Sequence, residues 1–117
     1  MVTQDQVNGF LKEFKINMRH WGILYRDDRG KNFQALVDLE MKPIDRDKVV
    51  DDLKAEDYCE GPLQDTLNRG KDMWVFGKIF KTKEIYIKIT MGIPGTKVIC
   101  ISFHVAEFKL SYPFKSN

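Results

Sequence analysis

The fold of this chain is decided by the stretch Glu84-Ile85-Tyr86-Ile87-Lys88-Ile89-Thr90, in which apolar and polar side chains alternate. Successive residues of a strand point to opposite faces of a sheet, so a period of two predicts a strand with one dry and one wet face. Similar stretches lie on either side, at residues 74–80 and 97–105, and short connectors join all three. Connectors of this length are typical of hairpins, so residues 73–105 are predicted to form an antiparallel meander.

Residues 1–55 have a helical period instead. Apolar side chains at helical spacing predict a first helix over residues 4–20, with Thr3 or Asp5 as its cap. Asn32 is a candidate cap for a second helix, which ends before Pro43. A third helix is predicted over roughly residues 45–54.

The remaining segments connect these elements. Ile23-Leu24-Tyr25 predicts a short strand, followed by a charged turn at residues 26–30. Residues 55–72 have mixed polarity and are interpreted as a long loop, whereas the apolar tail at 106–117 is expected to pack back on the body. We therefore predict a single α+β domain over residues 1–117, with N-terminal helices packed on one face of a three- or four-stranded antiparallel sheet.

Composition excludes several classes of protein. Hydrophobic residues make up 43% of the chain and aromatic residues 12%, which is ample for a packed interior. No apolar run approaches the roughly 18 residues of a membrane span, and the first residues lack the pattern of a signal peptide. Two cysteines, Cys59 and Cys100, are too few for a disulfide framework, so a reduced, cytoplasmic protein is expected.

Charge is distributed unevenly along the chain. Residues 1–60 carry a net charge of −3 and residues 61–117 a net charge of +5. The half that is predicted to form the sheet is therefore basic, and a basic sheet is a candidate surface for a polyanion. A solvated, lysine-rich face explains the charge alone equally well.

The wet face of the predicted meander holds the most informative side chains. Strict alternation places Tyr86, Lys88 and Thr90 on one face of the second strand, with Ile85, Ile87 and Ile89 on the dry face. In the third strand, alternation predicts that Ile99, Ile101 and Phe103 are dry and that Val98, Cys100, Ser102 and His104 lie opposite. Lys78 is a candidate to join this wet face from the first strand.

Tyrosine, histidine and lysine are the groups needed to cleave RNA without a metal. A base takes the proton of the ribose 2′-hydroxyl, a cation neutralises the transition state, and an acid protonates the departing 5′-oxygen. An ordinary solvated face also holds such residues by default. The cysteines and histidines show no paired ligand spacing, so neither a metal nor a cofactor is expected.

The meander also resembles a known family. Tyr86-Ile87-Lys88-Ile89-Thr90 and the later Ser102-Phe103-His104, with Trp74 upstream, resemble the motility quorum-sensing regulator (MqsR) family of toxins. Further similar segments are residues 25–32, 60–63 and 112–114. The resemblance implies a RelE-like fold and a ribosome-independent endoribonuclease that cuts mRNA, restrains growth and is neutralised by a partner antitoxin.

Carried over to this chain, the catalytic tyrosine of the family falls on Tyr86. The basic residue after Ser-Phe is usually lysine in the family and is His104 here, and the glutamine after the tryptophan is Val75 here. Lys71 lies only near the position of the family's loop lysine.

The leading hypothesis is therefore the toxin of a type II toxin–antitoxin pair, a metal-independent mRNA endonuclease whose partners are its antitoxin and mRNA. Its catalytic residues are predicted to be Tyr86, His104 and Lys88, and its RNA-binding residues Lys78, Trp74 and Ser102. One alternative is a non-catalytic module whose sheet binds RNA or a protein, and another is a small-ligand or regulatory domain.

Overall fold

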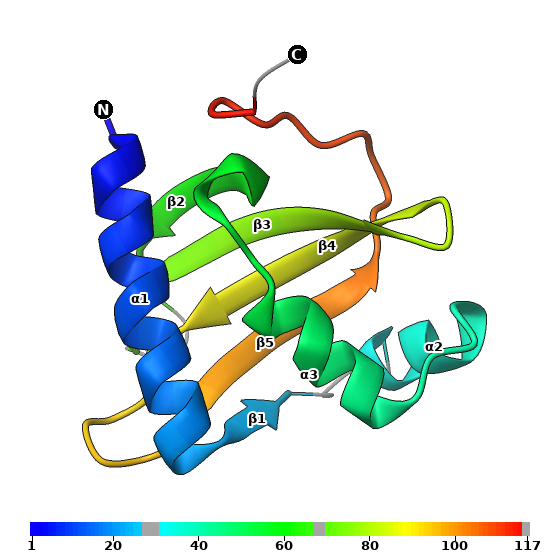
Figure 1. Cartoon of the computed structure of the whole chain (residues 1–117), viewed down its shortest axis with the longest axis horizontal. Helices are drawn as coiled ribbons and strands as arrows, with labels where there is room; N and C mark the ends of the chain where they lie inside the picture. Colours follow the sequence, from blue (N-terminus) through cyan, green and yellow to red (C-terminus); the bar gives the residue numbers. More distant parts are fainter. Residues whose placement is uncertain (27–30, 67–69, 116–117) are drawn as a thin grey trace.

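The computed structural model describes residues 1–26, 31–66 and 70–115. Within these ranges the chain is an α+β structure of three α-helices and a five-stranded mixed sheet (Figure 1). The helical elements are α1 (Gln4–Trp21), α2 (Lys31–Asp38), α3 (Pro43–Asp51) and the short 3-10 helix η1 (Ala55–Asp57). The strands are β1 (Ile23–Tyr25), β2 (Tyr58–Leu63), β3 (Met73–Phe80), β4 (Lys83–Thr90) and β5 (Val98–Val105).

The sheet has the strand order β1-β5-β4-β3-β2. β3, β4 and β5 pair antiparallel in chain order, as the alternation predicts, and the α+β class is confirmed. The predicted number of strands is wrong, because β1 adds to β5 in parallel and β2 adds to β3 at the other edge. β2 lies in the predicted loop, where Gly61, Pro62 and two shifts of register hide the period of a strand.

The helices begin close to their predicted positions. Thr3 caps α1 through a capping box with Gln6, as one of the two candidate caps. Pro43, which was expected only to end the second helix, occupies the first turn of α3, where its missing N–H costs nothing. The prediction that Asn32 caps the second helix is wrong, because Asn32 lies inside α2 and is buried. The turn predicted at residues 26–30 lies almost wholly outside the described residues.

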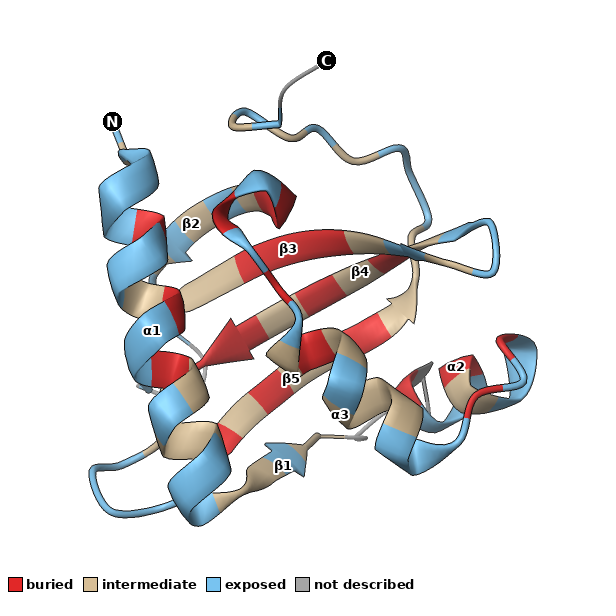
Figure 2. Cartoon of the chain, viewed as in Figure 1, coloured by how far each residue is buried: buried red, intermediate tan, exposed pale blue. Residues whose placement is uncertain are grey.

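The core lies between the sheet and the helices α1 and α3, which cover one face of it (Figures 1 and 2). The isoleucines of β4 are fully buried there, as their alternation predicts. Below, this helix-covered side is the inner face and the opposite side is the outer face. The side chains at the centre of the core are Val7, Leu11, Phe14, Val50, Leu53, Phe76, Ile85, Ile87, Ile89 and Phe103.

A β-bulge interrupts β5 at Ile101. Lys88 pairs with Ser102, but the next residue of β4, Ile89, pairs with Cys100, so β5 carries one extra residue. The bulge reverses the alternation before it. Cys100 and Val98, predicted on the wet face, are instead 0% exposed beside the buried isoleucines, and the prediction of a dry Ile99 and Ile101 is wrong. Beyond the bulge, Phe103 is buried on the inner face, as predicted.

The side chain of Asn32 holds the bulged segment of β5. Its Oδ1 accepts a hydrogen bond from the backbone N–H of Phe103 at 2.7 Å, and its Nδ2 donates to the carbonyl of Ile101 at 3.3 Å and to that of Arg26. β1 pairs only with the first part of β5, so beyond Cys100 the amide of Asn32 takes the place of a neighbouring strand. Among the described residues, no helix is long and apolar enough to cross a membrane.

Replacing Asn32 by alanine is expected to lower the free energy of unfolding by about 2 to 3 kcal/mol, because the buried N–H of Phe103 loses its acceptor. Gln34→Ala, on the exposed side of the same helix, is the matched control and is expected to change it by less than about 0.5 kcal/mol. Urea unfolding monitored by tryptophan fluorescence measures both. Equal stabilities of the two variants would contradict a structural role for this amide.

Candidate functional site

Four of the predicted site residues lie together on the outer face. Tyr86 of β4 pairs with His104 of β5, and Lys88 pairs with Ser102 one step along. The bulge lies before Ser102, so it leaves these four residues on the predicted face. All four side chains are partly exposed, so they are open to a ligand.

Tyr86 and His104 form a stacked pair. Their ring centroids are 5.2 Å apart with the planes inclined by 15°, and the Lys88 Nζ lies 6.0 Å from the centroid of the Tyr86 ring. His104 Nδ1 lies 2.9 Å from the backbone oxygen of Val105. A carbonyl oxygen only accepts, so Nδ1 carries the proton in this contact and Nε2 is left to exchange a proton with a ligand.

The phenol of Tyr86 is a donor in this setting. Burial raises its pKa above the ordinary value for tyrosine, and the negative charge of Glu60 adds to the shift. The hydroxyl therefore keeps its proton at neutral pH. Tyr86 can donate a hydrogen bond or a proton to a ligand, but it is a poor base.

The C-terminal tail forms one wall of this face, and sequence reasoning missed its role. The tail runs from the end of β5 past the hairpin of β3 and β4 toward β2 (Figure 1). The carboxylate of Glu84 accepts hydrogen bonds from the hydroxyl of Tyr112 at 2.7 Å and from the backbone N–H of Leu110 at 3.0 Å. Phe114 then packs on Tyr58 of β2, with ring centroids 5.3 Å apart.

Gly77 makes room for this tail. It pairs with Tyr86, so a side chain there would point from the outer face. A Cβ at Gly77 would meet the Tyr112 hydroxyl and would lie 2.7 Å from a methyl carbon of Leu110. The glycine was visible in the sequence, but nothing in its own strand indicates that a segment 33 residues later lies against it.

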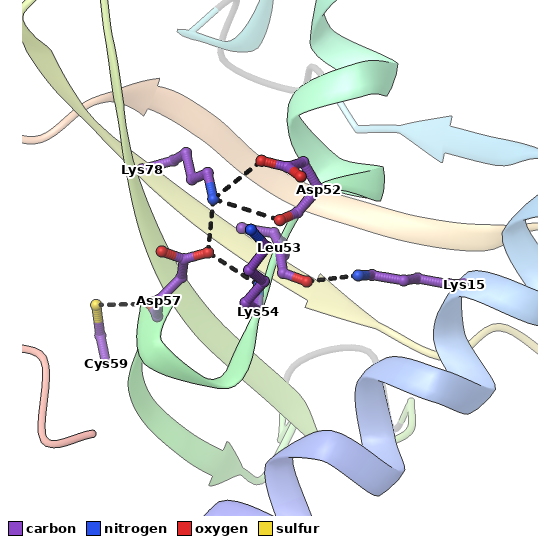
Figure 3. Close-up of polar contacts among 7 residues, drawn as sticks. All are labelled: Lys15, Asp52, Leu53, Lys54, Asp57, Cys59 and Lys78. Carbon is purple, nitrogen blue, oxygen red and sulfur yellow. Dashed lines mark hydrogen bonds and ion pairs between the residues drawn. The ribbon is translucent and has the colours of Figure 1, made fainter. Parts of the chain in front are cut away.

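Lys78 does not join the outer face. It pairs with Ile85, whose side chain is in the core, so the prediction that it joins the wet face from the first strand is wrong. Its ammonium lies 2.9 Å from a carboxylate oxygen of Asp57 and 3.2 Å from one of Asp52 (Figure 3). Burial lowers the pKa of Lys78, but the hydrogen bond and charge of Asp57, together with Asp52, outweigh burial, and the pKa is raised. The ion pairs of Lys78 therefore connect β3 to the segment that follows α3.

Trp74 also lies on the inner face, because it pairs with Ile89. Its ring stacks on Phe10 of α1, with centroids 4.7 Å apart and planes inclined by 14°. The tryptophan therefore packs the helix against the sheet and is not positioned to stack a base beside Tyr86. An open hollow of about 360 Å³ lies on the α3 side of β3, lined by Asp45, Lys48, Val49, Asp52, Lys78, Ile79 and Phe80.

In the described part of the chain, no three histidine, cysteine or acidic side chains gather in a way that could hold a metal ion. Comparison of the chain with models of protein families, with curated proteins and with solved structures finds no match in any of the three. The function is therefore inferred from the geometry of the outer face.

Replacing Lys78 by methionine is expected to lower the free energy of unfolding by about 2 to 3 kcal/mol, because the buried carboxylate of Asp57 loses its cation. Lys83→Met, an exposed lysine two residues before Ile85, is the control. Denaturant unfolding of both proteins gives the difference. An unchanged stability together with a tenfold weaker affinity for RNA would return Lys78 to a binding role.

Replacing Gly77 by alanine is expected to displace the tail from the outer face, because the new methyl group overlaps the Tyr112 hydroxyl. Limited proteolysis should then cut the variant after Lys109 or Lys115 faster than the wild type. Gly9→Ala, where an added Cβ meets nothing within 4 Å, is the control. Equal cleavage rates in all three proteins would contradict the placement of the tail.

Proposed function

We propose that this protein is a metal-independent endoribonuclease that cleaves mRNA on the outer face of its sheet. The observation that carries the proposal is the stacked pair of Tyr86 and His104, with Lys88 beside it on the same face. A proton-exchanging imidazole, a phenol that keeps its proton and a fixed cation are groups that serve RNA cleavage by transesterification.

Each group has a separate role in the proposed reaction. The Nε2 of His104 exchanges a proton with the sugar–phosphate backbone, and the hydroxyl of Tyr86 donates to the phosphate oxygens. Lys88 neutralises the charge that develops on phosphorus. The ribose 2′-oxygen attacks phosphorus and the bond to the 5′-oxygen breaks, so the products carry 2′,3′-cyclic phosphate and 5′-hydroxyl ends.

The substrate is proposed to be single-stranded. A base can stack on an aromatic ring only after it leaves a duplex, and the partly exposed rings of Tyr86 and His104 offer a surface for such stacking. The hydroxyl of Ser102, next to Lys88, is positioned to donate a hydrogen bond to the sugar–phosphate backbone of the RNA. The net charge of +5 in residues 61–117 favours a polyanion, and binding should weaken as salt rises.

The biological role proposed here follows from the resemblance to MqsR toxins. Tyr86, Lys88 and Thr90 on one strand, and Ser102 and His104 on the next, carry that resemblance, and an α+β domain with an antiparallel meander is compatible with a RelE-like fold. We propose that the protein is the toxin of a type II toxin–antitoxin pair, restrains growth, and binds a cognate antitoxin protein.

Incubation of purified protein with RNA in EDTA tests the nuclease directly. Wild-type protein is expected to release 2′,3′-cyclic phosphate ends. His104→Ala should reduce cleavage by about 10²- to 10⁴-fold, because it removes a proton-transfer group. Tyr86→Phe and Lys88→Met are expected to reduce it as well.

The chain offers a matched control for each variant. His20→Ala replaces the other histidine, at the end of α1, and Lys83→Met replaces a lysine of the same strand. Both should cleave like the wild type. RNA that is bound but stays intact would support the non-catalytic binding module instead, and equal cleavage by all variants would exclude the assigned site.

A further inference from the structure

The proposed reaction needs a proton acceptor at the ribose 2′-hydroxyl and a proton donor at the departing 5′-oxygen. These oxygens lie on opposite sides of phosphorus when displacement is in line, so two groups on opposite sides of the phosphate serve the reaction better than one. Tyr86 keeps its proton and cannot accept one at neutral pH. The outer face must therefore supply a base in addition to the imidazole of His104 if that imidazole is the acid.

Two other candidate proton acceptors near this face are the carboxylate of Glu84 and the thiol of Cys59. The carboxylate of Glu84 is occupied by Tyr112 and Leu110. Burial and the charges of Glu84, Asp57 and Glu60 raise the pKa of the Cys59 thiol to about 12, so it stays neutral. Neither group is poised to take a proton from a ligand.

Glu60 is different from both. It pairs with Val75, which in turn pairs with Lys88, so its side chain lies on the outer face in the same row as that lysine. Glu60 is exposed, and within the described ranges its carboxylate makes neither a hydrogen bond nor an ion pair. An unpaired carboxylate on a face that binds phosphate repels the ligand and weakens binding, so its place there is better explained by a role in the reaction than by a role in binding.

The position of Glu60 suits in-line displacement. It stands on β2 and His104 on β5, with Tyr86 and Lys88 on β4 between them. Neighbouring strands are about 4.8 Å apart, so the two backbones are roughly 14 Å apart, a gap for two side chains and a ribose phosphate to span. Across the sheet, the carboxylate of Glu60 thus comes first, the ammonium of Lys88 and the phenol of Tyr86 lie in the middle, and the imidazole of His104 comes last.

We propose that Glu60 is the general base of this site and that His104 is its general acid, an inference that rests on the proposed nuclease function. A carboxylate oxygen of Glu60 takes the proton of the 2′-hydroxyl as the 2′-oxygen attacks phosphorus. The bond from phosphorus to the 5′-oxygen breaks, and the imidazolium of His104 gives its Nε2 proton to that oxygen. Exchange with water then returns a proton to His104 and removes one from Glu60.

The charged and titratable groups around Glu60 and His104 affect the pH dependence expected of this site. Burial raises the pKa of Tyr58 and Cys59 of β2 and of Tyr86 of β4, and the charge of Glu60 adds to each of these shifts. From β4, Tyr86 stacks on His104 and Lys88 lies beside Tyr86. Among the described residues, neither Glu60 nor His104 forms an ion pair. A change of rate with pH is therefore not expected to come from the loss of an ion pair that stabilises the fold.

Glu60→Gln is the decisive variant, because it keeps the shape of the side chain and removes its charge. The kcat for RNA cleavage is expected to fall by about 10²- to 10⁴-fold. The affinity for RNA should be unchanged or higher, because a repelling charge is gone. Loss of fold would weaken both, and Glu56→Gln, an exposed glutamate in η1, is the matched control.

The pH profile of kcat/KM separates this assignment from a base at His104. A carboxylate base with an imidazole acid gives a bell, because the rate falls when the base gains its proton at low pH and when the acid loses its proton at high pH. The acid limb should vanish in Glu60→Gln. A wild-type rate that rises with pH to a plateau and has no alkaline limb, or a Glu60→Gln enzyme as fast as the wild type, would overturn the role of Glu60 while leaving the nuclease intact. A wild-type protein that leaves RNA uncut would overturn both.

Discussion

The bulge at Ile101, held by the amide of Asn32, is the constraint on which the outer face depends. Successive side chains of a strand alternate between the two faces of the sheet. One extra residue at the bulge therefore moves every side chain of β5 before it to the opposite face from the one that uninterrupted alternation predicts. Before the bulge, Val98 and Cys100 complete the core. After it, Ser102 and His104 stand beside Lys88 and Tyr86. Asn32 bonds to the residues on which this change of phase depends, Ile101 and Phe103.

Two lysines on neighbouring strands illustrate what the register decides. Lys78 and Lys88 look alike in the sequence, each between apolar residues of a predicted strand. Lys78 shares its face with the buried isoleucines and has to be neutralised by Asp57 and Asp52. Lys88 shares its face with Tyr86, and within the described ranges its ammonium has no ion-pair partner. The ammonium of Lys78 therefore stabilises the fold through its ion pairs, whereas the ammonium of Lys88 remains available to a ligand.

The sequence was a sound guide to local pattern and a poor one to pairing between distant segments. Strict alternation in β4 correctly placed Tyr86 and Lys88, and helical spacing located α1 and its Thr3 cap. The bulge was not predictable, because Ile101 has no local signal that distinguishes it from Ile99. The registers of Lys78 and Trp74 were missed because the phase of β3 relative to β4 is set by the hairpin between them, and not by either strand alone.

Parts of the site were missed for a similar reason. β2 is irregular and contains Gly61 and Pro62, so its period gave no sign that Glu60 would reach the outer face. The contact of Tyr112 with Glu84 joins residues 28 positions apart. Such contacts follow from how the tail crosses the sheet, which composition and periodicity do not encode. Individual chemistry-bearing residues were thus recognisable in the sequence, whereas their neighbours were not.

The most direct test of this account is the register of β4 and β5 in solution. Nuclear Overhauser contacts between the ring protons of Tyr86 and His104, together with contacts between Ile89 and Cys100, are predicted for the native protein, because the bulge separates these two pairings. Contacts of Ile89 with Cys100, and none between the rings of Tyr86 and His104, would describe a strand without the bulge, in which Tyr86 pairs with Phe103. That result would contradict the arrangement from which the outer face and its proposed chemistry are derived.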